Sequence, residues 1–368
     1  MKIKTITCHE VYNYGASLQE FALLIYLESL GHTVEAIHYK PMYLSQHFNL
    51  KAVSNPRFEK PFLKQLYILA KLIGRLKDLK RKKAFDLFAT KYIPTGKIRY
   101  ANNDELKENP PEADAFICGS DQIWNSFFEN GKDPAFYLDF VPDTKLKISY
   151  AASFAIDEIK EDLKPFVKAK ISRIDHISVR ETSGVTILNN LGIENVVQVL
   201  DPVFLLSANY WKETFVKSID KKFIFVYDFD SNPLIKQIAL DLKKEKGFKI
   251  YTVNKNINYA DESYYLEGPE QFISLMYCAQ FVITNSFHAA AFSLIFEKQF
   301  VVVNRMESIN TRMRDLLYLL NIQNSLISCF SEFKEMERIN YGVINSHVLD
   351  NIIHSKAFLL ESLKLKNK

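Results

Sequence analysis

The sequence predicts an α/β protein with two Rossmann-like domains that face each other across a cleft. Short apolar strands alternate with helices in two successive series, and such alternation is typical of parallel sheets. The chain has 368 residues, which exceeds the size at which one hydrophobic core keeps growing. We therefore expect an N-terminal domain over residues 1–205 and a C-terminal domain over residues 206–345. Asp201-Pro202 at their junction is expected to shape the interdomain turn rather than to catalyse.

The first series begins with a strand at residues 2–7, in which β-branched residues alternate with others. A helix at residues 18–30 and a second strand at 33–38 follow. This βαβ order implies a parallel sheet. The remaining strands of the first domain are expected at residues 115–118, 147–152, 177–181 and 196–200.

The second series predicts strands at residues 223–227, 249–253, 281–284 and 300–304, with helices at 234–246 and 272–279. A basic helix at residues 348–366 ends the series, and we expect it to pack back on the N-terminal domain. Open α/β sheets bind ligands at the carboxyl ends of their strands. The residues just past each strand are therefore the candidates for a functional site.

The composition is typical of a globular protein of the cytoplasm. Hydrophobic residues make up 48% and charged residues 24% of the chain, and no apolar run is long enough to span a membrane. The N-terminal residues lack the apolar segment of a signal peptide. The four cysteines include no CxxC pair, so we expect reduced thiols and neither a zinc site nor another bound metal.

A basic amphipathic helix is predicted as an insertion at about residues 57–90. Ten basic and two acidic residues between Arg57 and Lys83 give this window a net charge of +8, whereas the whole chain carries +4. Apolar residues recur there at helical spacing, namely Phe62, Leu66, Leu69, Ile73 and Leu76. This face either packs on its own domain or contacts an anionic membrane surface or a lipid-diphosphate substrate. We expect no nucleic-acid binding, because the motifs of such proteins are missing.

The most informative segment runs from Phe281 to Ser293. A buried strand leads into the polar turn Asn285-Ser286, and His288 then opens a helix that begins with small residues. A helix N-terminus at a strand end favours anions, and a histidine there can transfer a proton near neutral pH. The alternative interpretation is a helix-capping turn with a structural histidine.

Two loops of the first domain follow strands in the same way. Asn13-Tyr14-Gly15-Ala16 could hold an anion on its backbone N–H groups, although the chain has neither a dinucleotide fingerprint nor a P-loop. In the other loop, Asp121, Gln122 and Asn125 could bind sugar hydroxyls while Trp124 packs on a sugar face. The alternative for this loop is a helix that Asp121 caps.

Arginines follow two other strands. Arg180 ends an apolar strand beside Glu181 and suits a phosphate or a carboxylate, unless the two residues form a local ion pair. Three more arginines follow the last expected strand: Arg305, Arg312 and Arg314. We favour Arg312 as an anion ligand because it lies at the expected entry of a helix, and at least one of the three should be an ordinary surface charge.

Taken together, these segments resemble the polysaccharide pyruvyl transferase family. Seven motifs occur in the family's order over roughly residues 5–320. They are Asn13-Tyr14-Gly15-Ala16-Ser17-Leu18-Gln19, Gly119-Ser120-Asp121-Gln122-Ile123-Trp124-Asn125, Ser149-Tyr150-Ala151-Ala152-Ser153-Phe154, Ser178-Val179-Arg180-Glu181, Asp201-Pro202, Thr284-Asn285-Ser286-Phe287-His288 and Thr311-Arg312. The resemblance implies a GT-B-like fold. It also implies transfer of pyruvate from phosphoenolpyruvate to a sugar of a capsular, exopolysaccharide or cell-wall glycan as a cyclic ketal, with phosphoenolpyruvate as co-substrate and no further cofactor.

The resemblance also implies which residues serve the donor. In relatives, an arginine of the Ser-Val-Arg motif and a histidine of the strand-turn-helix motif do so, and these are Arg180 and His288 here. Some relatives carry a further arginine two residues before that histidine, where this chain has Ser286. We expect Arg312 or Arg305 to take the place of that missing cation.

These assignments give a mechanistic hypothesis. His288 is the expected general acid/base, and Arg180 and Arg312 would hold the carboxylate and the phosphate of the donor, with Asn285 and Ser286 as neutral donors. The acceptor is expected to be a glycan linked to a lipid diphosphate, which would place the enzyme in the cytoplasm with peripheral contact to the inner face of the cell membrane. Its expected ligands are Asn13, Tyr14, Asp121, Gln122, Trp124 and Asn125.

Two other functions stay open. A GT-B glycosyltransferase with a nucleotide-sugar donor would share the fold. It would need an acidic residue or a glutamine that contacts the nucleotide ribose, and Glu267-Gly268-Pro269-Glu270 is a weak candidate for that contact. A non-catalytic scaffold of a polysaccharide assembly complex would need no donor site. The sugar, its hydroxyl pair and the oligomeric state do not follow from the sequence.

Overall fold

The structure, a computed structural model, describes residues 1–44, 48, 61–305 and 311–364. The first of its two sheets has seven strands in the order β3-β2-β1-β4-β5-β6-β7, and all of its pairings are parallel. These strands are β1 (Lys2–Ile6), β2 (Thr33–Tyr39), β3 (Thr95–Tyr100), β4 (Ala115–Cys118), β5 (Leu146–Ala152), β6 (His176–Val179) and β7 (Val197–Gln198). The predicted strands are all present, and β3 is an addition that the sequence pattern did not indicate.

The second sheet has six strands in the order β10-β9-β8-β11-β12-β13, again parallel throughout. They are β8 (Phe223–Tyr227), β9 (Lys249–Thr252), β10 (Glu262–Ser263), β11 (Phe281–Thr284), β12 (Phe300–Val303) and β13 (Leu326–Ile327). In each sheet the strand order reverses beside the first strand, so β1 and β4 flank one switch point and β8 and β11 flank the other. The predicted class, α/β with two Rossmann-like domains, is confirmed.

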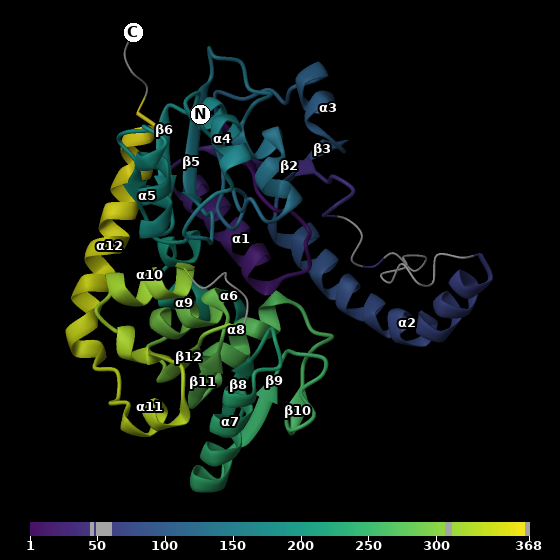
Figure 1. The fold of residues 1–368 in the computed structure, drawn as a ribbon, viewed down its shortest axis with the longest axis vertical. Coiled ribbons are helices and arrows are strands. Elements are labelled where there is room, and N and C mark those ends of the chain that lie inside the picture. Colours follow the sequence, from purple (N-terminus) through teal and green to yellow (C-terminus); the bar gives the residue numbers. More distant parts are fainter. Residues whose placement is uncertain (45–47, 49–60, 306–310, 365–368) are drawn as a thin grey trace.

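Helices cover both sheets, and Figure 1 shows the two lobes that result. In the N-terminal lobe they are α1 (Tyr14–Ser29), α3 (Asn103–Glu108), α4 (Lys164–Ile171) and α5 (Thr182–Asn190). In the C-terminal lobe they are α6 (Ala208–Phe215), α7 (Pro233–Lys246), α8 (Pro269–Cys278), α9 (Phe287–Ile295), α10 (Thr311–Leu319) and α11 (Phe330–Glu335). Helices α2 (Pro61–Tyr92) and α12 (Tyr341–Ser362) complete the described set.

The two lobes share one apolar core at the level of α1. The ring of Tyr14 stacks on Phe272 of α8 with 5.1 Å between centroids, and its hydroxyl donates to the carbonyl of Glu267. Further along α1, Phe21 packs on Trp211 of α6. The lobes are therefore pressed together rather than separated by an open groove. The first sheet ends with β7 in the chain and the second begins with β8. The domain boundary at residue 205 stays a prediction.

Helix α12 runs back from the C-terminal lobe to the N-terminal lobe (Figure 1). Its Ser355 hydroxyl accepts the N–H of Leu200, and the ring of Phe358 lies 6.4 Å from that of Tyr150. Helix α12 thus contacts the N-terminal lobe at these two points. Residues 365 and 366 of the predicted helix lie outside the described residues.

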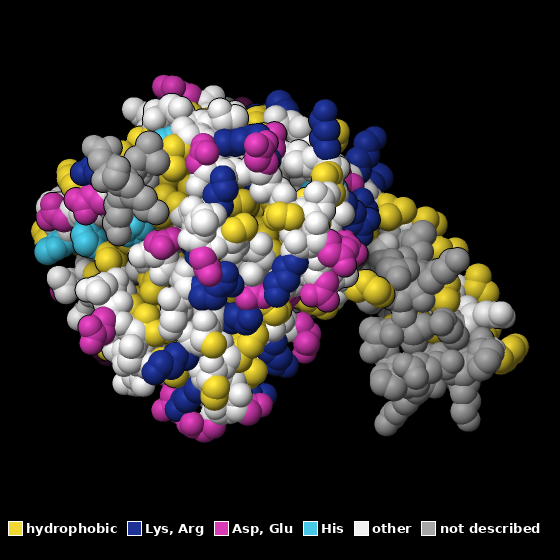
Figure 2. Space-filling view, turned by 90° about the horizontal axis from the view of Figure 1, so that it is seen from above, with side chains coloured by type: hydrophobic (Ala, Val, Ile, Leu, Met, Phe, Trp, Pro, Cys, Tyr) yellow, Lys and Arg dark blue, Asp and Glu magenta, His cyan; other side chains and the backbone are white. Residues whose placement is uncertain are grey.

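Helix α2 has a buried part and a free part. Arg81, Phe85 and Phe88 are buried against the body, whereas the first half of the helix stands away from it as an arm (Figures 1 and 2). Four apolar side chains of the arm are 49–73% exposed, namely Phe62, Leu66, Leu69 and Leu76. The interpretation that this face packs on its own domain is therefore wrong for these four residues. Residues 57–60 of the predicted insertion, and the side chain of Ile73, lie outside the part that is described.

A membrane span would require a long and apolar helix among the described helices. None of them, within the described ranges, combines the length and the apolar character that crossing a bilayer demands.

Candidate functional site

Both switch points open onto one small cavity between the lobes. It has a volume of about 90 Å³, and residues of both domains line it: Asn13, Asp121, Gln122, Phe229, Asn285, Ser286, Phe287, His288, Arg305, Arg312 and Met313. Asn13 and Asp121 follow β1 and β4, while Phe229 and Asn285 follow β8 and β11. The cavity thus lies where open parallel sheets bind ligands, and it lies there for both sheets at once.

Three helix N-termini end at this cavity. Asn13 caps α1 by accepting the N–H groups of Gly15 and Ala16, and Ser286 caps α9 by accepting the N–H of Ala289. Helix α10 begins at Thr311 and presents Arg312 in its first turn. Each helix N-terminus carries partial positive charge, so together they favour an anionic ligand.

His288 sits at the centre of the charged groups and faces a buried carboxylate. Its Nε2 lies 3.5 Å from Oδ2 of Asp201, and the same oxygen accepts a hydrogen bond of 2.5 Å from Arg180 Nη1. Asp201 is fully buried. Burial alone would raise the pKa of Asp201, but His288, Arg180 and the N–H of Val203 outweigh it and hold that pKa well below its usual range. The carboxylate therefore stays ionised and orients the imidazole.

The imidazole is held from its other side by the backbone of α1. A Cβ atom on Gly15 would lie 1.9 Å from Nδ1 of His288 and 2.2 Å from its Cγ. No side chain fits between them, which is the reason for a glycine at the second residue of the helix. The N-terminal lobe thus fixes the position of a histidine that belongs to the C-terminal lobe.

Arg180 lies one layer behind the cavity and is not among its lining residues. It is paired with Asp201, lies 3.6 Å from Asp121 and 3.9 Å from Glu181, and stacks 4.4 Å from the ring of Phe287. Burial would lower the pKa of Arg180, but the three carboxylates raise it above its ordinary value. Its Nε and Nη2 atoms make no hydrogen bond to any described residue. Arg180 therefore lies between Asp201 and Asp121. Its Nε and Nη2 groups are the two donors that remain without a hydrogen bond among the described residues.

Arg312 reaches the cavity from the C-terminal lobe. Its Nη1 lies 3.6 Å from Oδ1 of Asp121. With the amide of Gln122 turned so that its oxygen faces Arg312, that oxygen accepts from both terminal nitrogens at 2.7 and 3.2 Å. Burial and the nearby charge of Arg180 lower the pKa of Arg312 to about 10, so the guanidinium remains a cation at neutral pH. A charge that is desolvated in this way favours an anionic partner.

The other two arginines after β12 differ in their surroundings. Arg305 lines the cavity and stacks 4.2 Å from the ring of Phe229. Arg314 pairs with Asp157 and Asp315, and its side chain is 39% exposed. Arg314 is therefore the ordinary surface charge that the sequence led us to expect among the three.

Asn285 and Ser286 are engaged by the protein itself. The Asn285 amide donates to Asp228 at 2.9 Å and to Asp230 at 2.6 Å, and its oxygen accepts the N–H of Phe229. Burial and a hydrogen bond with Asp230 raise the pKa of Asp228 to about 6. Asn285 and Ser286 line the cavity, and their side-chain hydrogen bonds hold the turn between β11 and α9.

Three of the predicted acceptor ligands do not reach the cavity. Trp124 is fully buried, stacks on Tyr137 and donates to the carbonyl of Phe136, so it cannot pack on a sugar. Asn125 is also fully buried, and its side-chain oxygen accepts the N–H of Phe127. Tyr14 is buried in the contact between the lobes. The prediction that Tyr14, Trp124 and Asn125 bind the acceptor is therefore wrong. Residues that follow a strand can point into the core below their loop as well as into a cavity above it, and these three point into the core.

Three residues belong to the site although the sequence pattern did not indicate a role for them there: Asp201, Gly15 and Phe287. Asp201 was assigned to a turn, yet it is the carboxylate that joins His288 to Arg180. The available signal was its position after β7, which is the neighbour of β6, the strand that Arg180 follows. Gly15 and Phe287 lie within two of the motifs, but their roles depend on contacts between the lobes. Gly15 packs against the His288 ring, and Phe287 stacks on Arg180. The Glu267–Glu270 segment packs on α2, since a Cβ on Gly268 would lie 3.1 Å from the carbonyl of Ala84.

Comparison with known proteins gives one family and several distant folds. The family model described as "Polysaccharide pyruvyl transferase" matches residues 13–306, whereas a comparison with curated proteins gives no match. Among solved structures, UDP-GlcNAc 2-epimerase from Neisseria meningitidis bound to UDP-GlcNAc is similar at 12% identity and a TM-score of 0.46, with 99% of each chain covered. The E. coli heptosyltransferase WaaC with ADP is similar at 11% identity and a TM-score of 0.40, covering 95% of this chain and 100% of that one. Arabidopsis thaliana UGT89C1 complexed with UDP-L-rhamnose is similar at 9% identity and a TM-score of 0.46, with 98% and 92% covered.

Proposed function

The chain belongs to the polysaccharide pyruvyl transferase family, and from this premise we propose that it moves pyruvate from phosphoenolpyruvate to a sugar of a cell-surface glycan. The product is a cyclic ketal on two hydroxyls of the sugar, and inorganic phosphate is released. The observation that carries the proposal is the placement of His288, braced by Asp201, in a cavity where three helix N-termini and two arginines meet.

The donor fits the charge of this cavity. Phosphoenolpyruvate is small and carries two anionic groups, a carboxylate and a phosphate. Arg312 and Arg305 supply two cations at the cavity wall. The N-termini of α1, α9 and α10 add partial positive charge from their helix dipoles. The family's further arginine before the histidine is replaced by Ser286, and Arg312 takes over its charge from α10.

The reaction has two steps in which atoms and charges balance. In the first, an acceptor hydroxyl oxygen bonds to C2 of phosphoenolpyruvate while the double-bond electrons take a proton at C3, so the methylene becomes a methyl group. The hydroxyl proton passes to a base. In the second step the other hydroxyl bonds to C2, the bond from C2 to the phosphate oxygen breaks, and phosphate leaves with the proton of that hydroxyl.

His288 is the group that we assign to the proton at C3. Asp201 lies 3.5 Å from Nε2 and orients the ring, as a carboxylate does for a catalytic imidazole. Such general acid/base catalysis contributes about 10²- to 10⁴-fold in rate. Arg180 is assigned a positioning role, because it holds Asp201 and Asp121 from behind the cavity.

The acceptor approaches from the N-terminal lobe in this proposal. Asp121, Gln122 and Asn13 line that side of the cavity and offer acceptors and donors for sugar hydroxyls. The arm of α2 belongs to the same lobe, and its exposed apolar residues alternate with basic ones. We assign the arm to an anionic membrane surface, which would bring the enzyme to a lipid-diphosphate-linked glycan at the inner face of the cell membrane.

The experiment measures phosphate release from phosphoenolpyruvate over a panel of synthetic lipid-diphosphate glycans, with mass spectrometry of the glycan for the ketal. The wild type should turn over with one of them, and His288→Gln should be about 10²- to 10⁴-fold slower. His354→Gln changes an exposed histidine of α12 and serves as the matched control with unchanged rate. Equal rates for wild type and His288→Gln would refute the assignment.

A binding measurement separates the competing functions without knowledge of the acceptor. Thermal unfolding is followed with phosphoenolpyruvate and with a panel of nucleotide-sugars. Stabilisation by phosphoenolpyruvate alone supports the proposal, and stabilisation by a nucleotide-sugar alone would favour a glycosyltransferase. No stabilisation by either ligand would favour a scaffold.

A further inference from the structure

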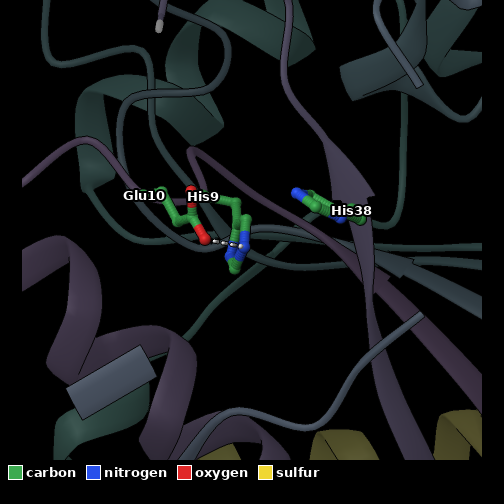
Figure 3. A group of neighbouring side chains, drawn as sticks. All are labelled: His9, Glu10 and His38. Carbon is green, nitrogen blue, oxygen red and sulfur yellow. Dashed lines mark ion pairs between the residues drawn. The ribbon is translucent and has the colours of Figure 1, made fainter. Parts of the chain in front are cut away.

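Two histidines and a glutamate lie together near the carboxyl ends of β1 and β2 in the N-terminal sheet. None of them lines the cavity. His9 and Glu10 follow β1, and His38 lies on the neighbouring strand β2. Each offers one ligand atom, and these atoms all lie within 4.8 Å of one another. Figure 3 shows His9 between Glu10 and His38, with the Glu10 carboxylate turned towards His9. The pyruvyl transfer mechanism uses none of these side chains.

The imidazole of His9 is prepared as a ligand. Nδ1 lies 2.8 Å from Oε1 of Glu20, a buried carboxylate of α1. This bond places the ring proton on Nδ1 and leaves the lone pair of Nε2 free. The side chain of His9 is only 2% exposed, and Nε2 makes no hydrogen bond to any described residue. Carboxylate–histidine pairs of this kind orient the metal-binding imidazoles of many proteins.

The spacing of the ligand atoms suits a tetrahedral ion. Bonds of about 2.0–2.1 Å from zinc to nitrogen or oxygen place neighbouring ligand atoms about 3.3 Å apart. His9 Nε2 and Glu10 Oε1 are 3.5 Å apart. His38 completes the group after a side-chain shift of at most about 1.5 Å, from the 4.8 Å limit to the tetrahedral spacing, and its half-buried ring permits such a shift.

The surroundings of Glu10 suit the charged carboxylate that a metal needs. Lys40 pairs with Oε2 of Glu10, which leaves Oε1 for an ion. Glu10 adopts φ of 52°, a conformation that is strained for a non-glycine residue and that turns its carboxylate back onto His9.

We propose that His9, Glu10 and His38 form a binding site for one divalent transition-metal ion of the zinc class. Two imidazole nitrogens and one carboxylate oxygen are the ligands that zinc prefers alongside thiolates, and water would complete the coordination. The absence of cysteine pairs predicted no metal, whereas these ligands come from the loop after β1 and from β2 and become neighbours only in the folded sheet.

The role of this ion would be structural. It would join the loop after β1 to β2, and this loop continues directly into Asn13 and Gly15, which form the cavity wall and the seat of His288. Glu20 belongs to α1 as well, so the ion would hold both ends of the loop. The proposal does not depend on the reaction that the cavity catalyses.

The test uses the full chain, stripped with a chelator and titrated with Zn²⁺ by calorimetry and with Co²⁺ by absorption spectroscopy. We expect one ion per chain, a rise in melting temperature, and a Co²⁺ spectrum of nitrogen and oxygen ligands. His38→Gln should abolish saturable binding while the metal-free protein keeps its melting temperature, because this ring is only half-buried. Glu20→Gln should weaken binding about 10- to 100-fold, as loss of a supporting carboxylate does.

His354→Gln on α12 is the matched control and should bind as the wild type does. Absence of saturable binding in the wild type would overturn the proposal. Equal binding by wild type and His38→Gln, or a thiolate charge-transfer band with Co²⁺, would also overturn it by placing the ion on other residues.

Discussion

Gly15 and His288 are in direct contact across the two lobes, since a Cβ atom on Gly15 would lie 1.9 Å from the imidazole Nδ1. The contact joins the N-terminus of α1 to the N-terminus of α9, so the site is complete only when the lobes are packed together. Asp201 approaches the same ring from its opposite side at 3.5 Å. The histidine is therefore held by elements that lie far apart in the sequence.

The first prediction follows from that contact. Gly15→Ala must displace the imidazole, because the neighbouring atoms are less than 3.0 Å from the new methyl group. We expect the rate of phosphate release to fall by about 10²-fold or more, as it does when a catalytic acid/base is misplaced. Gly74→Ala is the matched control, since it is an exposed helical glycine with no atom within 4 Å. A Gly15→Ala enzyme with wild-type turnover would show that the contact is not required.

The second prediction separates two arginines that lie two residues apart. Arg312→Ala removes a buried cation from the cavity, so we expect the KM for phosphoenolpyruvate to rise about 10- to 100-fold, the effect of losing a hydrogen bond to a charged group. Arg312→Lys should recover little of this loss, because an ammonium lacks the paired donors of a guanidinium. Arg314→Ala, at the surface pair with Asp157, should leave the KM unchanged. Equal effects of the two alanine variants would contradict our assignment.

The sequence predicted the sheets well because their signal is local. Strands such as Ala115–Cys118 and Phe281–Thr284 are short apolar runs, and parallel strands buried on both faces have that composition. Strand β3 escaped prediction because Thr95–Tyr100 is a largely exposed edge strand with polar residues. Its pairing with β2 is a tertiary contact that periodicity does not report.

The candidate site was predicted in part, for a related reason. Strand ends and helix starts can be located along a chain, and this placed His288, Asp121 and Arg312 at one cavity. Whether a residue past a strand faces a ligand or the core depends on how the loop turns, and Trp124 turned inward. The partner of His288 could not be found from spacing, because Asp201 lies 87 positions before it in the chain and meets it only across the lobes.

The third prediction concerns the arm of α2. Leu66 and Leu69 are 50% and 63% exposed, so replacing both with glutamate should leave the fold intact while it removes apolar area and adds negative charge. We expect the wild type to float with vesicles that contain phosphatidylglycerol, with binding reduced by salt, and the double variant to remain unbound. Leu240→Glu on α7, at a comparably exposed leucine, should float as the wild type does. Failure of the wild type to bind at low salt would remove the membrane assignment.

The fourth prediction is a pH dependence that arises at Asp228. Burial and the hydrogen bond with Asp230 raise its pKa to about 6 in the folded state, whereas an unfolded aspartate titrates near about 3.9. Between these values the unfolded chain loses the proton first, so the free energy of unfolding falls as the pH rises through this window and levels off above it. The fall from this group is at most roughly 3 kcal/mol, at about 1.4 kcal/mol per pKa unit. Asp230→Asn removes the second cause and leaves burial, so urea unfolding should show the difference between pH 4 and pH 7 reduced by roughly 1 kcal/mol. Asp350→Asn on the exposed side of α12 should leave that difference unchanged, and an unchanged difference in Asp230→Asn itself would mean that the two carboxyl groups do not share a proton.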